Sequence, residues 1–272
     1  MNILVTLDEN YVPYLNVMLS SLKESNKGEF FEIYLLHTDM RESALDKTRR
    51  ILGEDGRINM IRADEKMLDS APTTSRYPKE IYYRIFAAKY LPDSLDRVLY
   101  LDPDIIVNGS LKKLYSLDMG DSYFAAASHT ESTVMHKVNE LRLDMDEESP
   151  YINSGVMLMN LDKLREEQDT SEVFDFIERR KKFLVLPDQD IISSLYGSRI
   201  IPLDTFRYNM TERLYMLHSP FEKKINLDWV RENSVVIHYC GRNKPWKSGY
   251  VGRLDEFYRE AESALRAELP EA

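Results

Sequence analysis

Short apolar runs alternate with amphipathic stretches through the first 90 residues of the chain. The runs expected to form strands cover residues 2–8, 31–38 and 58–64, and the stretches expected to form helices cover residues 11–23, 41–52 and 78–90. Strands that alternate with helices in this way are typical of an α/β sheet with helices on both faces. The pattern therefore predicts an α/β protein with a Rossmann-like mixed sheet flanked by helices.

The later part of the chain continues this alternation less regularly. Further strands are expected at residues 98–107, 122–129, 153–160, 199–204 and 234–239, and further helices at residues 171–182, 190–196 and 254–267. Residues 205–232 show no clear period but carry several aromatic residues, which is typical of a functional loop region or a small subdomain. Because no linker is visible, we expect a single domain over residues 1–250 and a carboxyl-terminal helix at residues 251–272 that packs on or near it.

Charge and cysteine content limit the partners of the chain. Its 36 lysine and arginine residues against 46 aspartate and glutamate residues give a net charge of −10, which argues against nucleic acid as a partner. A phosphate ligand would need a metal ion and a few placed cations, because the overall field repels anions. Cys240 is the only cysteine, and no leader-like or membrane-spanning apolar segment is visible. We expect a cytoplasmic protein with no internal disulfide and no transmembrane segment.

Two aspartates, Asp102 and Asp104, follow the apolar, strand-like residues 98–101. A carboxylate in such a segment costs free energy unless a cation pairs with it. Short carboxylates are hard oxygen ligands that suit Mg²⁺ or Mn²⁺, often with substrate phosphates completing the coordination. The alternative is an Asp-Pro turn that closes the strand, since Pro103 fixes its own backbone angle.

A second candidate group near the carboxyl end has the pattern HxxGxxKPW. The imidazole of His238 can ligate a metal ion, Gly241 lets the backbone approach a ligand closely, and Lys244 offers a charge to a phosphate. Nitrogen beside carboxylate ligands favours Mn²⁺ over Mg²⁺. The alternative is a hydrogen-bonded structural histidine. If Asp8, Asp102 and His238 each end a strand, one crevice at the carboxyl edge of the sheet holds all three.

Arg84 lies on the face of its expected helix that should be buried. Ile81, Arg84, Ile85 and Ala88 occupy positions i, i+3, i+4 and i+7, which lie on one face of a helix. A buried guanidinium needs an anionic or multi-acceptor partner. That partner is either a carboxylate of the protein or the phosphate or sugar of a bound donor.

Several separated motifs then appear in order along the chain. They are TLDENY from residue 6, YYR ending at residue 84, LYLDPDIIV from residue 99, YINSGVMLMN from residue 151, LPDQDI from residue 186 and HYCGRNKPW from residue 238. Together they resemble glycosyltransferase family 8, which includes bacterial lipopolysaccharide galactosyl- and glucosyltransferases and, more distantly, glycogenin. The resemblance spans nearly the whole chain. It implies a GT-A fold, a UDP-sugar donor, a divalent metal and transfer of a hexose with retention of the anomeric configuration.

The resemblance also implies roles for individual residues. Those expected at uracil and ribose are Thr6, Asp8 and Asn10. Those expected at the metal ion, Mn²⁺ or Mg²⁺, are Asp102, Asp104 and His238, with Pro103 between the two acids offering the nucleotide a carbonyl but no N–H. Those expected at the diphosphate are Gly241 and Lys244. Arg84 is expected at the donor, and Asn153 at the sugar or the acceptor, although an asparagine in a turn before a strand fits that position as well.

Asp188, Gln189 and Asp190 stand at the start of an expected helix. By position alone, Asp188 suits the N-cap and Asp190 suits the positive end of the helix dipole. The resemblance instead implies that Asp188 grips sugar hydroxyls, that Gln189 lies by the anomeric carbon and that Asp190 is a candidate nucleophile. Retention requires either a covalent intermediate on a carboxylate or a front-face attack guided by the departing diphosphate. The sequence leaves both routes open.

The donor hexose implied by the resemblance is glucose or galactose, and the expected acceptor is a carbohydrate or glycolipid of the cell envelope. Such an acceptor would be reached transiently at the inner face of the membrane. One alternative is a glycogenin-like enzyme that glycosylates itself. Another is a nucleotide-sugar-binding regulatory protein without transferase turnover, against which the intact Asp102, Asp104, His238, Lys244 and Gln189 argue. The oligomeric state is not predicted.

Overall fold

Apolar residues of the first strand enter two different hydrophobic cores. The computed structural model describes residues 1–64, 80–128, 133–219 and 225–269. In it, Ile3 and Val5 of β1 (Asn2–Thr6) pack into one core, and Leu4 packs into another. Successive residues of a strand face opposite sides of a sheet, so a strand that is covered on both faces needs a continuous apolar run. This requirement explains the sequence of β1.

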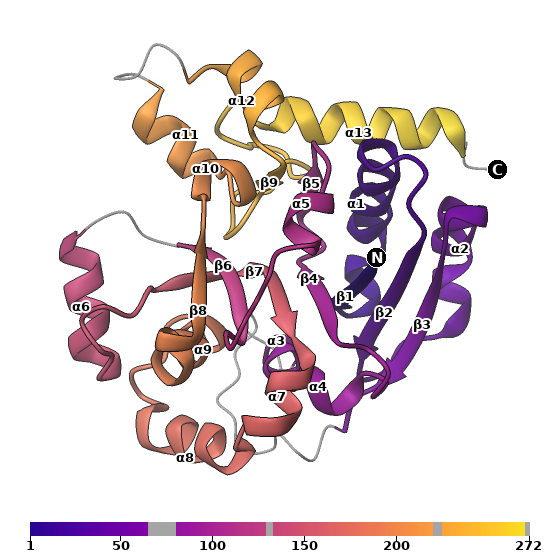
Figure 1. The fold of residues 1–272 in the computed structure, drawn as a ribbon. Coiled ribbons are helices and arrows are strands. Elements are labelled where there is room, and N and C mark those ends of the chain that lie inside the picture. Colours follow the sequence, from indigo (N-terminus) through magenta and orange to yellow (C-terminus); the bar gives the residue numbers. More distant parts are fainter. Residues whose placement is uncertain (65–79, 129–132, 220–224, 270–272) are drawn as a thin grey trace.

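The central sheet has seven strands in the order β3-β2-β1-β4-β7-β6-β8 (Figure 1). Besides β1, they are β2 (Phe31–His37), β3 (Gly56–Arg62), β4 (Arg97–Leu101), β6 (Phe124–Ser128), β7 (Ile152–Asn160) and β8 (Ile200–Leu203). Strand β7 is antiparallel to both of its neighbours, β4 and β6, and the other pairs are parallel. The predicted Rossmann-like mixed sheet is confirmed.

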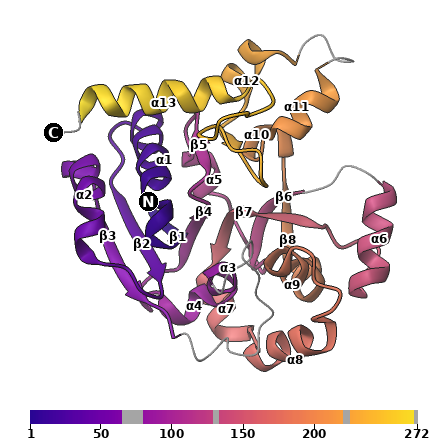
Figure 2. The same ribbon diagram turned by 180° about the vertical axis from the view of Figure 1, so that it is seen from behind.

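Helices cover both faces of this sheet (Figures 1 and 2). The first core is covered by α1 (Val12–Ser25), α2 (Asp46–Leu52), α5 (Lys112–Tyr115) and α13 (Asp255–Glu268). The second core is covered by α3 (Glu80–Tyr83), α4 (Ala87–Tyr90), α6 (Thr133–Leu143), α7 (Leu161–Glu167), α8 (Thr170–Arg180) and α9 (Pro187–Tyr196). Helices α5, α6 and α7 were not expected from the sequence. None of the helices in the described ranges is long and apolar enough to cross a bilayer.

The helix at the carboxyl end packs against α1. It buries Phe257, Tyr258 and Leu265 in the first core. Leu265 lies seven positions after Tyr258 and eight after Phe257, spacings that place the three side chains on one apolar stripe of α13. The proposed division into a domain at residues 1–250 and an attached helix at residues 251–272 stays a prediction.

The apolar run expected at residues 98–107 forms two strands that belong to different sheets. Strand β4 ends at Leu101, and the chain turns before β5 (Ile105–Val107) begins. Pro103 lies in this turn, where its missing N–H cannot be used by a continuing ladder. Strand β5 pairs antiparallel with β9 (Val236–His238) in a two-stranded sheet. The turn therefore moves the chain from the central sheet to the small one.

The helix expected at residues 78–90 is interrupted. Residues 78–79 lie outside the described residues, and a 3₁₀ turn at Arg84–Phe86 separates α3 from α4. Arg84 is 5% exposed, so the burial predicted from its spacing is confirmed.

The aperiodic segment at residues 205–232 forms three short helices near β5 and β9 (Figure 1), with residues 220–224 outside the described residues. They are α10 (Thr205–Tyr208), α11 (Glu212–His218) and α12 (Leu227–Asn233). Each begins with a side chain that accepts a hydrogen bond from the first turn, and these caps are Asp204, Thr211 and Asn226. Helices of one or two turns are too short to show a period, which is why the sequence pattern did not reveal them.

Candidate functional site

Strand pairing brings the two aspartates and the histidine together. Asp102 directly follows β4, and its N–H donates to the carbonyl of Gly155 on β7 at 2.8 Å. In the small sheet, Ile105 of β5 pairs with His238 of β9, which places the histidine beside Asp104. One ligand atom from each of Asp102, Asp104 and His238 lies within 4.8 Å of the other two. Of the three residues expected at one strand edge, Asp102 and His238 therefore lie together, joined by Asp104 and not by Asp8, and their role as metal ligands stays a prediction.

The donor set of this cluster fits a divalent cation. His238 Nε2 lies 3.2 Å from Asp104 Oδ1 and 3.6 Å from Asp102 Oδ2. Both His238 Nε2 and Asp104 Oδ1 are buried and lack a hydrogen-bond partner in the part of the chain that the structure describes. Buried polar atoms are normally paired, so two of them facing each other fit a site in which a cation is their common partner. Carboxylate oxygens with an imidazole nitrogen suit Mn²⁺, and Mg²⁺ accepts the oxygen ligands as well.

Gly155 leaves the space that the ligands occupy. A Cβ atom built at Gly155 would lie 2.3 Å from His238 Cε1, 2.8 Å from Asp102 Oδ2 and 3.0 Å from His238 Nε2. Any side chain at this position would therefore push the imidazole and one carboxylate away. The cluster therefore requires glycine at position 155, the last residue of the YINSG motif.

Lys244 forms a buried ion pair with Asp104 Oδ2, and it also donates to the carbonyl of Tyr239 at 2.8 Å. Burial by itself would raise the pKa of the Asp104 carboxyl, but that pKa is held below its ordinary value, chiefly by the ammonium of Lys244. Burial would lower the pKa of the Lys244 ammonium, and Asp104 more than offsets this, so that pKa is raised. Both groups are therefore charged near neutral pH.

Arg84 joins the end of β4 to the start of α9. Its Nη1 lies 3.1 Å from Asp102 Oδ1 and 3.1 Å from Asp188 Oδ2, and the guanidinium stacks over the ring of Tyr100 at 4.3 Å. The Tyr100 hydroxyl donates to Asp102 Oδ1 at 2.6 Å and lies 3.0 Å from Thr6 Oγ1. The partners of Arg84 in the structure therefore include two carboxylates of the protein and Ser154, and Thr6 joins the cluster through Tyr100.

The three polar residues at the start of α9 have different surroundings. Asp188 pairs with Arg84 and accepts from the Ser154 hydroxyl at 2.7 Å. Its pKa is raised because burial outweighs the opposing effects of Arg84 and Ser154. Gln189 Oε1 accepts from Asn153 Nδ2 at 3.3 Å, while its Nε2 is buried without a partner among the described residues. Asp188 is not the N-cap, because the helix begins after Leu186.

Asp190 is fully buried and takes part in a separate network. Its two oxygens accept from both ends of the Arg142 guanidinium at 2.7 and 2.8 Å, and one of them also accepts from the Tyr151 hydroxyl at 2.7 Å. The N–H groups of Val185 and Leu186 donate to the other oxygen at 2.7 and 3.1 Å. Asp190 thus connects α6, which carries Arg142, to the loop that precedes α9.

Of the remaining predicted residues, Asp8, Asn10 and Gly241 lie outside this buried cluster. Asp8 caps the 3₁₀ turn at Glu9–Tyr11 by accepting from the N–H of Tyr11 at 3.2 Å, and it also accepts from Asn10 Nδ2 at 3.2 Å. Asp8, Asn10 and Gly241 are exposed. Gly241 has a φ of 84°, in the left-handed region that favours glycine. Pro103 is buried between the two aspartates.

Sequence reasoning missed several residues of the metal-ligand cluster and of the Asp190 network. Gly155 and Ser154 lie in a motif that was quoted, yet their roles depend on which side chains face them across the sheet. Arg142 lies on a helix that the sequence did not predict. Asn209, whose Oδ1 lies 2.9 Å from Nδ1 of His238, lies in the aperiodic segment. No local pattern marks either residue, because each one acts through a contact with a distant part of the chain.

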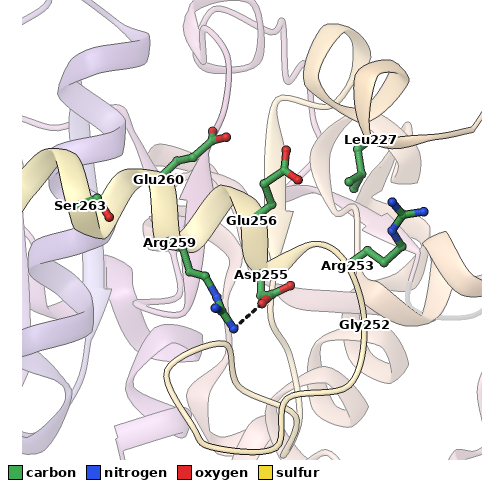
Figure 3. A pocket seen from close by; sticks show the side chains of 8 residues that line it. All are labelled: Leu227, Gly252, Arg253, Asp255, Glu256, Arg259, Glu260 and Ser263. Carbon is green, nitrogen blue, oxygen red and sulfur yellow. Dashed lines mark ion pairs between the residues drawn. The ribbon is translucent and has the colours of Figure 1, made fainter.

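A hollow of about 580 Å³ lies elsewhere on the molecule, where α13 meets Leu227, Gly252 and Arg253 (Figure 3). Its charged walls include an ion pair between Asp255 and Arg259 at 2.7 Å. None of the residues predicted for the site lines this hollow. It therefore adds no residue to the cluster.

The sequence model of glycosyl transferase family 8 matches residues 2–249. The chain belongs to glycosyl transferase family 8. This family 8 protein is 30% identical over 248 residues to a lipopolysaccharide 1,2-glucosyltransferase of Escherichia coli, a match that covers 88% of this chain and 71% of the relative. A lipopolysaccharide 1,3-galactosyltransferase of Salmonella typhimurium is 24% identical over 276 residues, with 96% and 77% covered.

Solved structures confirm the fold of this family 8 protein. The crystal structure of the galactosyltransferase LgtC in complex with donor and acceptor sugar analogs matches with a TM-score of 0.83. The match covers 97% of this chain and 96% of LgtC at 24% sequence identity. The GT-A fold implied by the sequence motifs is therefore confirmed.

Gly155→Ala should weaken Mn²⁺ binding by about 10–100-fold, the usual effect of disturbing the residues that orient metal ligands. The reason is the 2.3 Å approach of the added Cβ to His238 Cε1. Titration of the purified protein with Mn²⁺, followed by electron paramagnetic resonance of the free ion, measures this. Gly109→Ala is the matched control, since its added Cβ would approach no atom closer than 3.5 Å. Equal affinity in the two variants would contradict the role given to Gly155.

Lys244→Met should tighten Mn²⁺ binding in the absence of nucleotide. A metal ion at Asp104 must displace the ammonium of Lys244 from that carboxylate. Because a hydrogen bond to a charged group contributes about 1.5–3 kcal/mol, removing the ammonium should raise the affinity for Mn²⁺ about tenfold or more. Methionine keeps the apolar stem that is buried there. Isothermal titration with Mn²⁺ measures the change, and the exposed Lys247→Met is the control. Weaker binding in Lys244→Met would show that the lysine assists the metal directly.

Arg142→Met should lower the free energy of unfolding by about 3–5 kcal/mol, because it leaves the buried Asp190 carboxylate without its cation. Urea unfolding followed by circular dichroism gives the value. Arg179→Met on the exposed side of α8 should change stability by less than about 0.5 kcal/mol. If both variants unfold at the same urea concentration, the Asp190 network does not stabilise the fold.

Proposed function

We propose that this family 8 protein is a metal-dependent hexosyltransferase that moves glucose or galactose from a UDP-sugar to a glycan acceptor with retention of configuration. The observation that supports the proposal most strongly is the cluster of Asp102, Asp104 and His238, whose facing atoms Oδ1 of Asp104 and Nε2 of His238 have no partner among the described residues. A cation at these ligands would leave coordination positions for the oxygens of a diphosphate.

In this proposal the nucleotide lies along the edge between β1 and the small sheet. Asp8 and Asn10, exposed after β1, would hydrogen-bond uracil and ribose, and Thr6 would support them from the buried side. Gly241 would let the backbone after β9 approach the diphosphate. Lys244 would then leave Asp104 and pair with a phosphate oxygen, which is also an anion. The metal ion would replace the ammonium at the Asp104 carboxylate.

Catalysis follows from where negative charge develops. A divalent cation at the three ligands would stabilise the charge that grows on the leaving diphosphate. The ammonium of Lys244 acts on the same oxygens from a buried position, where its attraction is stronger than in water. Arg84 holds Asp102 toward the cluster and Asp188 toward the sugar side, so it orients both acids without contacting the donor.

For the sugar side we propose contacts from Asp188, Gln189 and Asn153. The Gln189 Nε2 group is a buried donor without a partner among the described residues, and a sugar hydroxyl would satisfy it. Asp190 is assigned a structural role, because both of its oxygens are occupied by Arg142, Tyr151 and backbone N–H groups. A nucleophilic carboxylate needs a free oxygen at the anomeric carbon, which Asp190 does not offer.

This assignment favours front-face transfer over a covalent intermediate. The acceptor hydroxyl oxygen would bond to the anomeric carbon as the bond from that carbon to the diphosphate oxygen breaks. The acceptor proton would pass to the departing diphosphate, so that no carboxylate of the protein forms a covalent bond to the sugar. The retained configuration follows because attack and departure occur on the same face.

The acceptor is proposed to be a carbohydrate or glycolipid of the cell envelope. This rests on the relatives named as lipopolysaccharide glucosyl- and galactosyltransferases. We propose that transfer takes place in the cytoplasm, with the acceptor reached at the inner face of the membrane.

The test is release of UDP from a panel of UDP-sugars in the presence of Mn²⁺ and without acceptor, with Asp104→Asn beside the wild type. One sugar should be hydrolysed slowly, and the variant should lose this activity by about 10²–10³-fold or more, because it loses both a metal ligand and a charge. The fully exposed Asp93→Asn is the control. Tight binding of UDP and Mn²⁺ with no turnover of any sugar, with or without envelope glycans, would instead favour a nucleotide-sugar-binding regulatory protein.

A further inference from the structure

The second ring nitrogen of His238 has a buried partner. His238 Nδ1 lies 2.9 Å from Oδ1 of Asn209, and the two residues are 2% and 3% exposed. An amide oxygen only accepts hydrogen bonds, so the nitrogen that faces it carries the proton. In a neutral imidazole the other nitrogen, Nε2, then presents a lone pair.

The surroundings of Nε2 agree with this arrangement. Asp104 Oδ1 lies 3.2 Å away, within reach of an N–H donor, yet no hydrogen bond joins the two atoms. The space that Gly155 leaves open borders His238 Nε2 and Asp102 Oδ2. A cation satisfies two acceptors that face each other in this way.

The backbone fixes Asn209 relative to His238. Asn209 ends α10, where its N–H donates to the carbonyl of Thr205 at 2.9 Å. The next residue, Met210, bridges to β9: its N–H donates to the carbonyl of Val236 at 3.0 Å, and its carbonyl accepts from the N–H of His238 at 2.8 Å. Two main-chain hydrogen bonds therefore set the position of the amide before any ligand is present.

We propose that Asn209 is a positioning residue that selects the Nδ1–H tautomer of His238 and aims Nε2 at the metal ion. The inference rests on the proposed metal-dependent function. Metal-bound histidines usually donate their other N–H to a carbonyl or carboxylate, and this partner fixes the orientation of the ring and raises its basicity. The short helices at residues 205–232, whose sequence shows no period, thus contribute directly to the metal centre through α10.

The test compares Asn209→Ala with Asn209→Asp in the full chain. The alanine variant should bind Mn²⁺ about 10–100-fold more weakly than the wild type, because it lacks the acceptor. The aspartate variant should keep wild-type affinity, since a carboxylate accepts the same hydrogen bond. Asn16→Ala is the matched control: Asn16 is also buried and hydrogen-bonded, to Thr48 at 2.7 Å, but lies outside the cluster. It should lower stability without changing Mn²⁺ affinity.

Long-range ¹H–¹⁵N spectra of the wild-type protein provide a readout that does not depend on the variants. They should show the His238 proton on Nδ1. A proton on Nε2, or equal Mn²⁺ affinity in the wild type and Asn209→Ala, would overturn the inference while leaving the metal site intact. If the wild type bound no Mn²⁺ with or without UDP, the proposed function would fail together with the inference.

Discussion

Largely buried carboxylates in close proximity are the constraint on which the rest of the site depends. Asp102 and Asp188 share Arg84, and Asp104 pairs with Lys244. Unpaired, these acids would repel one another and lose hydration, which is costly in a protein interior. Counted as formal charges, the three carboxylates and two basic side chains leave one net negative charge. The two basic residues thus let the acids remain ionised while the cluster still attracts a further cation.

The two cations have different tasks because they are held differently. Arg84 comes from the 3₁₀ turn between α3 and α4 and connects two acids on separate elements, so moving it would separate the end of β4 from the start of α9. Lys244 pairs with one acid only and lies on the irregular segment after β9. A donor diphosphate offers this lysine an equivalent anion. The same physical requirement, neutralising buried carboxylates, therefore yields one permanent pair and one exchangeable pair.

The sequence predicted the parts of the site that follow directly from strand ends. Asp102 and His238 could be placed together because each ends an apolar run, and the ends of strands meet at one edge of a sheet. The burial of Arg84 followed from helical spacing although the helix itself is broken. Gly155 and Asn209 could not be assigned, because their roles depend on packing between distant segments. For Asp190, the motif suggested chemistry, whereas the partners that occupy its oxygens come from an unpredicted helix and a loop.

The account depends most on a single divalent cation bound between the small sheet and the end of β4. Anomalous diffraction at the manganese absorption edge, from crystals grown with Mn²⁺ and UDP, tests this directly. The account predicts one strong peak within roughly 2.0–2.6 Å of Asp102, Asp104 and His238 Nε2, the range of bonds between hard cations and their ligands. A fully occupied UDP with no manganese peak at these three residues, or a peak held by other residues, would contradict it.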